Sequence, residues 1–477
     1  MKPPKSRKAE LAPNATGGEK SHAEAKCARA EGVGLPECEA RAAKRSQEAA
    51  SAEFKMTELG PIPVDWEVAE ISDLYEVRSS KRVFRSQWRS SGIPFYRARD
   101  IVGFRHGEQA IGGLFIDKAL YEKYKRDYGV PSIDDLLVTA VGTLGSVFRV
   151  SNESPFYFKD GNIIWFKSKG KYDSRLLEVL FESGFLDSQI YDTAGGSTVG
   201  TYTISNAKKT LVPFPPLAEQ RRIAGALSDV DELISALGKL IEKKRNIKTG
   251  AMQELLGMRN EECGMRNVPR RRLPGFSGEW IEKRLGECGS FSKGAGISRA
   301  QANSGRIPAV RYGELYTTHH EYIKAFESFI SDDVARCSTR LTRGDIVFAC
   351  SGETKEEIGK CAAFLGDEIA YAGGDLLILS PKEAYDSKFL AFELNTPFCA
   401  SQKAAAGQGD AVVHIRQHSL EELIVCIPPT LAEQKAIAAV LSDMDAEIAS
   451  LEVDRAKYER IKSGMKQELL TGRTRLA

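Results

Sequence analysis

The chain has 477 residues, of which 42% are hydrophobic and 28% charged, and its formal net charge is only +2. These values are ordinary for a globular protein and exclude disorder along the whole chain. The length exceeds what one hydrophobic core usually serves, so we expect two or three domains. Because the charges nearly balance, a nucleic-acid partner can be inferred only from local clusters of basic residues.

Cysteine usage and hydropathy restrict the compartment. The nine cysteines form no CxxC pair, and an odd number favours reduced thiols over a disulfide framework. No apolar run approaches the ~20 residues that span a bilayer, and the N-terminus lacks the apolar core of a secretory signal. The sequence therefore predicts a cytoplasmic protein with no membrane partner.

The first segment, residues 1–55, is rich in Ala, Lys, Glu and Arg and has few large apolar side chains. Such a composition cannot bury enough apolar surface to join a core. We interpret it as a disordered N-terminal extension or, alternatively, as sequence upstream of a natural start at Met56.

The rest of the chain is a tandem duplication. The sequence LAEQ at residues 217–220 recurs at 431–434, an offset of 431 − 217 = 214. At the same offset QELL at 253–256 recurs at 467–470, and Arg97 is matched by Arg311. Two copies with so long a period cannot be a solenoid, so each copy must be a domain with an appended element. Between the shared ends the copies diverge, which suits two modules of one architecture that bind different things.

Each copy begins with a globular part, at residues 56–212 and 273–427. Short β-rich runs, such as 162–166 and 376–379, alternate with glycines and with helical stretches such as 174–182. This mixture predicts α/β or mixed α+β domains. A proline pair closes each domain and suits the entry to a helix.

Each copy ends in a long helix, predicted within residues 213–257 and 428–477, with a linker at 258–272 after the first. Apolar residues in these helices step by four and three, the heptad stripe of a coiled coil. An isolated stripe would expose its seam, so an antiparallel coiled coil between the two helices is the economical arrangement. The predicted seam residues are Ile223, Leu227, Val230, Ile234, Leu237, Ile241, Ile437, Leu441, Met444, Ile448, Leu451, Tyr458 and Ile461.

The length of the helices suggests a use. A helix over residues 217–256 would span ~60 Å, comparable with about 17 base pairs of B-DNA. The helices could therefore act as a ruler between the two domains. The alternative is a dimerisation arm with no role in spacing.

The repeated blocks resemble the specificity subunit of type I restriction-modification systems. The resemblance rests on PPLAEQRRI at residues 215–223, LAEQKAI at 431–437, GPIPVDW at 60–66 and GSTVGTYTIS at 196–205. It covers about residues 57–476. The chain departs from the pattern in its N-terminal extension and at Thr430, where the first block has a second proline.

The resemblance implies a non-catalytic chain with a defined set of partners. Each globular part would be a target recognition domain that reads one half of a bipartite site in double-stranded DNA. The paired helices would dock two methyltransferase (modification) subunits, and restriction/translocase subunits would join this core. S-adenosylmethionine, ATP and magnesium would then bind the partner subunits and not this chain.

DNA contacts are predicted from basic residues interleaved with aromatic ones near the start of the first domain. Arginine forks can grip phosphates or bind guanine through two hydrogen bonds. The alternative is a solvated basic face. The candidates in this cluster are Arg78, Lys81, Arg82, Arg85, Arg89, Arg97, Arg99 and Arg105.

The second domain has fewer basic candidates, and each domain has a polar loop before its helix. The loops, at residues 195–202 and 407–416, could present side chains to base edges or could simply be hinges. The candidates in the first domain are Thr143 and, in its loop, Ser197, Thr198 and Tyr202. Those in the second domain are Lys293, Arg299, Arg306, Arg311, Tyr312, Gln408, His414 and Arg416.

Two rival functions remain. Asp345, Glu353 and Lys355 could be drawn as a metal-dependent nuclease triad, but the first copy has no acid or base at the matching positions. His319 and His320 fit a surface pair better than a metal site, because no further ligand has suitable spacing. A scaffold that binds only protein is the third possibility.

Overall fold

The computed structural model describes residues 53–105, 113–192, 200–257, 269–409 and 412–476. The chain divides into two compact units, residues 1–232 with 459–477, and residues 233–458. Nearly all of the predicted N-terminal extension lies outside the described residues, although Phe54 and Lys55 already belong to the first strand. The boundaries predicted for the domains stay predictions.

The first unit is built on a four-stranded antiparallel sheet in the order β4-β11-β8-β9. Its central strand β11 is buried from Ile163 to Phe166, as the apolar run predicted. A second sheet has the order β10-β6-β7-β5, and the pairs β1-β2 and β12-β3 complete the unit. The strands are β1 Phe54–Thr57, β2 Gly60–Pro63, β3 Glu67–Glu70, β4 Tyr75–Arg78, β5 Trp88–Arg89, β6 Ile93–Tyr96, β7 Phe115–Ile116, β8 Leu136–Thr139, β9 Val147–Arg149, β10 Tyr157–Phe158, β11 Ile163–Ser168 and β12 Leu211–Phe214.

Helices cover these sheets. The predicted helix at residues 174–182 is α6, which packs against β9 and buries its apolar side chains. Asp173 caps it by accepting a hydrogen bond from the Arg175 N–H, which satisfies one of the free amides of the first turn. The helices of this unit are α3 Ile71–Leu74, η1 Arg85–Gln87, α4 Ala98–Arg105, α5 Lys118–Tyr128, α6 Ser174–Glu182, α7 Asp187–Asp192 and α8 Ile204–Lys209.

The second unit repeats this plan. Its sheet has the order β14-β22-β18-β20, where β22 takes the place of β11, and β13-β24 takes the place of β12-β3. The sheet β16-β15-β21-β17 and the pair β19-β23 are the remaining strands among the described residues. The strands are β13 Ile281–Arg284, β14 Gly289–Lys293, β15 Ile307–Val310, β16 Ser328–Ile330, β17 Thr339–Leu341, β18 Ile346–Ala349, β19 Ser351–Gly352, β20 Cys361–Ala363, β21 Ala370–Ala372, β22 Leu376–Pro381, β23 Val413–His414 and β24 Ile424–Ile427.

The helices of the second unit follow the same logic, with α13 in the place of α6. Asp386 caps α13 as Asp173 caps α6. The predicted duplication and the mixed α and β class are therefore confirmed. The short helices are α10 Leu285–Cys288, η3 Arg299–Gln301, α11 Glu314–Thr317, α12 Asp332–Arg336, α13 Ser387–Leu394, α14 Pro397–Ala406 and α15 Gln417–Glu421.

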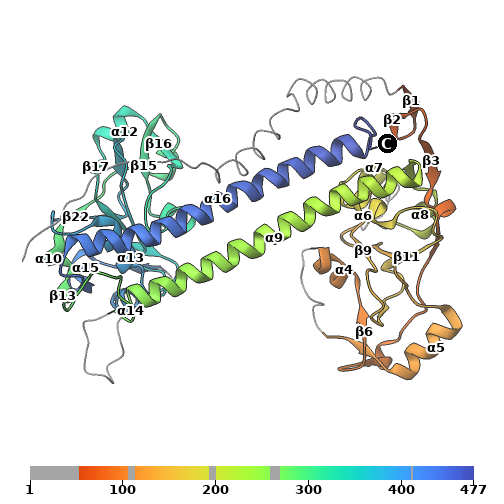
Figure 1. Cartoon of the computed structure of the whole chain (residues 1–477), viewed down its shortest axis with the longest axis horizontal. Helices are drawn as coiled ribbons and strands as arrows, with labels where there is room; N and C mark the ends of the chain where they lie inside the picture. Colours follow the sequence, from red (N-terminus) through yellow and green to blue (C-terminus); the bar gives the residue numbers. More distant parts are fainter. Residues whose placement is uncertain (1–52, 106–112, 193–199, 258–268, 410–411, 477) are drawn as a thin grey trace, which may run out of the picture. The chain divides into compact units, whose positions relative to one another are not determined.

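Two long helices, α9 (Leu217–Leu255) and α16 (Leu431–Leu469), have 39 residues each and are each about 58 Å long. They pack together in both units (Figure 1). In the second unit Lys244 pairs with Glu447 at 2.6 Å and Lys248 with Asp445 at 2.8 Å. In the first unit Lys462 pairs with Asp231. Within the second unit the α16 partner number falls as the α9 number rises, so the predicted antiparallel pairing is confirmed.

Burial along the helices follows the predicted seam most closely where the globular parts add contacts. Ile223, Leu227, Ile437 and Leu441 are at most 2% exposed, whereas Val230, Ile234 and Leu237 are half-buried. Ile461 departs from the prediction, because it is 40% exposed. The adjacent Lys462 instead takes up a contact with α9, through its ion pair with Asp231. No helix within the described ranges is long and apolar enough to cross a bilayer.

Candidate nucleic-acid interface

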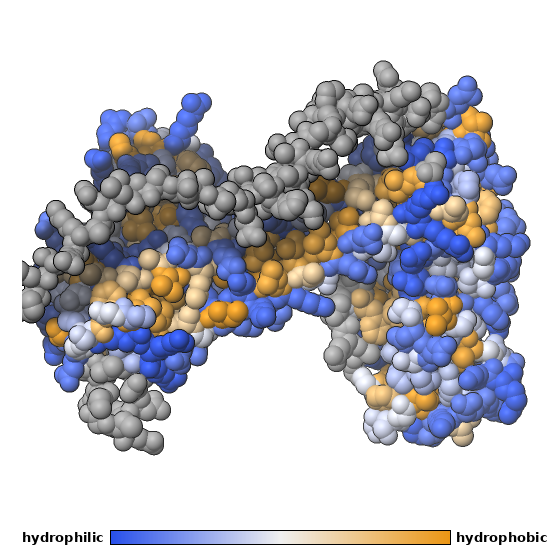
Figure 2. All heavy atoms as spheres, in the orientation of Figure 1, coloured by the Kyte–Doolittle hydropathy of each residue, from blue (hydrophilic) through white to orange (hydrophobic). Residues whose placement is uncertain are grey.

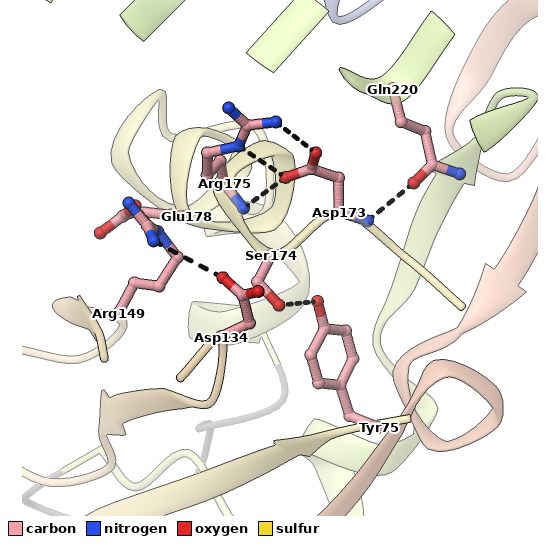
Figure 3. A network of polar contacts seen from close by, with 8 residues as sticks. All are labelled: Tyr75, Asp134, Arg149, Asp173, Ser174, Arg175, Glu178 and Gln220. Atoms are coloured by element: carbon pink, nitrogen blue, oxygen red, sulfur yellow. Dashed lines mark hydrogen bonds and ion pairs between the residues drawn. The ribbon is translucent and has the colours of Figure 1, made fainter. Parts of the chain in front are cut away.

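The LAEQ motif forms the joint between each globular part and its long helix. Figure 3 shows this joint in the first unit, where Gln220 contacts Asp173. The Gln220 side chain accepts a hydrogen bond from the Asp173 N–H at 2.9 Å and donates to the Pro215 carbonyl at 2.7 Å. Asp173 is also the cap of α6, so one residue connects α6 to the start of α9. In the second unit Gln434 accepts from the Asp386 N–H at 2.8 Å in the same way. The repeated glutamine therefore fixes the helix to its domain.

The glutamate of the motif anchors a second contact. Glu219 accepts a hydrogen bond from the indole Nε1 of Trp66 at 3.0 Å and two from Arg475, at 2.7 and 2.8 Å. Arg475 also binds Asp65 through two hydrogen bonds, at 2.8 and 2.7 Å, and this guanidinium lowers the pKa of Asp65. Because Arg475 follows α16, it ties the chain's last residues to the start of α9.

We call the contact of Trp66, Glu219 and Arg475 the Trp–Glu–Arg clasp. The second unit has the same clasp, built from a different stretch of chain. Glu433 accepts from the Nε1 of Trp280 at 3.3 Å and from Arg272 at 2.9 and 2.7 Å. Arg272 follows α9, as Arg475 follows α16. Each long helix is thus held at its start by an arginine that lies beyond the end of the other. The 214-residue offset relates Trp66 to Trp280 and Glu219 to Glu433, but it does not relate their arginine partners, so the repeat gave no sign of them.

The basic cluster predicted in the first domain is largely ion-paired. Arg82 pairs with Asp160 and Arg89 with Asp117, both at 2.8 Å. Arg78 pairs with Glu76 at 3.2 Å, and its guanidinium lies 4.8 Å from the centre of the Trp165 ring. Between Arg78 and Arg105 the sequence has one acid, Asp100, whereas the fold brings in Asp117 and Asp160 from elsewhere. The local excess of positive charge is therefore smaller than the sequence predicted.

The remaining members of this cluster differ in exposure. Arg97 and Arg99 both contact the buried Asp100, at 3.4 and 4.0 Å. Lys81 and Arg85 are exposed. The side chain of Arg105 is not among those that the structure describes. DNA contact by these residues stays a prediction.

The other candidate residues of the first domain differ in burial. Tyr202 is fully buried, and its hydroxyl shares a 2.7 Å hydrogen bond with the Thr210 hydroxyl, so it has no surface to offer a base edge. Burial raises its pKa. Thr143 is exposed at the turn between β8 and β9. Ser197 and Thr198 lie outside the described residues.

In the second domain the structure brings three candidates together. Arg299, Arg311 and Tyr312 line one cavity of 520 Å³. Lys293 and Arg306 are exposed but do not line it. The sequence did not predict this grouping, because Arg299 precedes strand β15 in the chain and Arg311 follows it.

The polar loop of the second domain, predicted at residues 407–416, is held by hydrogen bonds between its own backbone groups. Gln408 and His414 exchange backbone hydrogen bonds of 2.9 and 2.8 Å, and the His414 ring lies 3.0 Å from the Ser351 hydroxyl. Arg416 is exposed at the start of α15. The loop therefore holds exposed polar side chains beside β19.

No observation supports the nuclease alternative. Asp345 is 5% exposed, and its carboxylate accepts hydrogen bonds from the Thr342 N–H and the Ser380 hydroxyl, at 2.7 and 2.6 Å. Asp345 directly precedes strand β18, whereas Glu353 follows strand β19, and neither carboxylate is hydrogen-bonded to the other. Among the described residues no group of three or more His, Cys, Asp or Glu could hold a metal ion. His319 is 1% exposed, so the predicted surface pair is wrong for His319, and only His320 lies at the surface.

Comparison with known proteins decides the family. Residues 63–246 and 277–459 each match the type I restriction modification DNA specificity domain. The chain belongs to the type I restriction-modification specificity family. The MjaX specificity subunit of Methanocaldococcus jannaschii is 26% identical over 440 residues, which cover 89% of this chain and 97% of that protein. The specificity subunit S.HindORF215P of Haemophilus influenzae is 32% identical over 171 residues, 36% of this chain and 41% of that one.

Solved structures agree on the fold. The S subunit of a type I system from M. genitalium superposes with a TM-score of 0.54 at 16% identity, over 85% of this chain and 96% of that chain. A chain from a study of assembly in a type I system gives 0.52 at 16% identity, over 87% and 99%. The specificity subunit described here has two recognition domains, binds DNA, acts with other restriction-modification subunits and is not itself catalytic.

Proposed function

We propose that each recognition domain reads one half of a bipartite target in double-stranded DNA. Support comes from the duplication itself. The two units share the Trp–Glu–Arg clasp and the glutamine joint, yet the surfaces of their recognition domains differ. Arg85 and Arg299 occupy equivalent positions on η1 and η3. Arg299 lines a cavity together with Arg311, whereas Arg97, the equivalent of Arg311 in the first unit, is paired with Asp100. A common frame with different reading surfaces is what two half-sites of unrelated sequence require.

The long helices would serve as the docking surface for two methyltransferase subunits, which restriction/translocase subunits would join. Hydrophobic residues gather along these helices (Figure 2). On α9, Leu233, Leu240 and Ile247 recur every seven residues and are 38, 37 and 47% exposed. A regular apolar stripe left in water supports a protein partner. S-adenosylmethionine, ATP and magnesium would bind those partners, and the complex would work in the cytoplasm.

The test is a selection from random duplexes with the full chain bound to its methyltransferase. We expect a motif of two short specified blocks separated by unspecified bases. Arg85→Ala should alter the first block alone, because Arg85 is exposed in the first unit and has no ion pair among the described residues. A single continuous motif, or equal changes in both blocks, would contradict the proposal.

A second experiment addresses spacing. Deleting one heptad from each long helix keeps the seam in register. We expect the variant to select a different number of bases between the two blocks, with the blocks themselves unchanged. If the variant selects the original spacing, the helices do not act as a ruler.

A further inference from the structure

The cavity of the second unit has a rigid floor made by two glycine-rich loops. The Gly374 N–H donates to the Gly296 carbonyl at 3.0 Å, and the Ala295 N–H donates to the Ala372 carbonyl at 3.2 Å. A Cβ at Gly294 would lie 2.0 Å from the Gly373 carbonyl oxygen, so this close approach requires glycine. The two loops therefore form one fixed surface at the base of the cavity.

Backbone strain occurs at the same place. Ile297 has a φ of 61°, and a β-branched residue in the left-handed region is a true outlier. Its side chain is 6% exposed and packs with Ala309, Ile330 and Ala335, which holds the strained conformation. Such strain is maintained where a loop must present neighbouring groups in a fixed direction. The neighbouring groups here are Ser298 and Arg299, both of which line the cavity.

The cavity is rich in hydrogen-bond donors that the protein itself does not use. Neither Arg299 nor Arg311 makes an ion pair or hydrogen bond through its guanidinium within the part of the chain that is described. This contrasts with Arg97, the equivalent of Arg311 in the first unit, which is paired with Asp100. Tyr312 is 37% exposed and can add a hydroxyl donor. Unpaired guanidinium groups on a cavity wall are available to a ligand.

One carboxylate acceptor lines the same cavity as these donors. Asp375 lines the cavity, is exposed, and forms no ion pair with either arginine. Its carboxylate has no hydrogen-bond partner among the described residues. It directly precedes β22, and the matching residue before β11 in the first unit is Asn162. The two recognition domains therefore place different functional groups at this position.

We propose that this cavity reads a G·C base pair in the second half of the target, an inference that rests on the proposed function. In the major groove guanine offers the acceptors O6 and N7, which an arginine can bind through two hydrogen bonds. Cytosine offers the N4 amino group, which an Asp carboxylate can accept. Arg299 or Arg311 would bind the guanine, and Asp375 would bind the cytosine.

Two other ligands fit less well. An adenine is usually read by a Gln or Asn that both donates and accepts. The Gln301 oxygen already accepts from the Ser298 N–H and hydroxyl, both at 2.9 Å, so only its amino group remains free. A DNA phosphate would suit the arginines but would be repelled by the Asp375 carboxylate. The set of free groups therefore favours the G·C pair.

The experiment compares duplexes selected by the full chain, assembled with its methyltransferase, for the wild type, Arg299→Ala, Arg311→Ala and Asp375→Asn. We expect a G·C pair at one position of the second block in the wild type. Asp375→Asn and at least one arginine variant should lower the preference at that position by roughly 5- to 150-fold. The first block should be unchanged in every variant. Arg343→Ala is the control, because this exposed arginine pairs with Asp367 and does not line the cavity.

The outcomes separate this inference from the function on which it rests. A wild-type selection without two blocks would overturn the proposed function. If the wild type selects two blocks and the cavity variants select the same motif, only the cavity assignment fails. Uniformly weaker binding without relaxation at any position would indicate a phosphate contact and would also refute base reading. Thermal unfolding of each variant excludes misfolding as the cause of a changed motif.

Discussion

The Arg475 clasp predicts a large loss of stability from one substitution near the end of the chain. Arg475 makes two hydrogen bonds to Glu219 and two to Asp65, and its side chain is 17% exposed. The Glu219 side chain is 3% exposed. In Arg475→Ala the carboxylate of Glu219 would keep the hydrogen bond from Trp66 but lose its counter-ion.

The magnitude follows from this burial. Removing one partner of a buried ion pair costs about 3–5 kcal/mol, because the remaining charge stays desolvated. For a folded unit of about 150–250 residues, each kcal/mol lowers the melting temperature by about 2–4 °C, so we expect a decrease on the order of 10 °C. Arg475→Lys should lose less, since it keeps the charge but cannot form both paired hydrogen bonds.

Calorimetry and hydrogen exchange measure the effect. Exchange should quicken around Trp66 and in the first turns of α9 in Arg475→Ala. Arg473→Ala is the matched control, because Arg473 is exposed and has no partner among the described residues. Its free energy of unfolding should change by less than about 0.5 kcal/mol. If Arg475→Ala has the same melting temperature as this control, the clasp does not stabilise the first unit.

Two further predictions concern buried ionisable side chains of the second unit. Burial raises the pKa of Glu393 to about 8, so the folded state keeps a proton that the unfolded state releases near pH 4.3. The free energy of unfolding should therefore fall by up to about 1.4 kcal/mol per pH unit between those values, and urea titrations across pH should find this slope absent in Glu393→Gln. Lys248 lies 2.8 Å from both Glu321 and Asp445, so Lys248→Met should lower the free energy of unfolding in denaturant by about 3–5 kcal/mol. An unchanged midpoint would contradict this prediction. Lys248→Arg tests whether a positive charge alone is enough to keep the stability.

The repeat made the architecture predictable, because identical offsets at both ends of each copy required two modules of one fold. The heptad stripes likewise predicted a helix pair, since an apolar seam needs a partner. The role of LAEQ was not predictable. Glu219 and Gln220 act through Arg475 and the Asp173 amide, which lie far away in the sequence, and no local pattern reveals such contacts.

The reading surface was harder to predict for a related reason. A basic interval in the sequence says nothing of acids that the fold brings beside it, and Asp117 and Asp160 neutralise two of the arginines. Tyr202 is polar in composition but belongs to the core, where Thr210 satisfies its hydroxyl. Conversely, Asp375 has no basic or aromatic neighbours in sequence that would mark it. Only the fold brings it into one cavity with two arginines.

The difference between joint and reading surface has an energetic cause. The joint residues Glu219, Gln220, Glu433 and Gln434 are at most 3% exposed, and losing a partner leaves a buried polar group unsatisfied, at a cost of about 1–3 kcal/mol or more. Exposed cavity residues such as Asp375 have no partners to lose, so their replacement should change stability by about 0.5 kcal/mol or less. Cavity residues can therefore be replaced, and the base preference changed, without loss of the fold. Replacing a joint residue, in contrast, destabilises the fold. This explains why the two copies share their ends and differ in between.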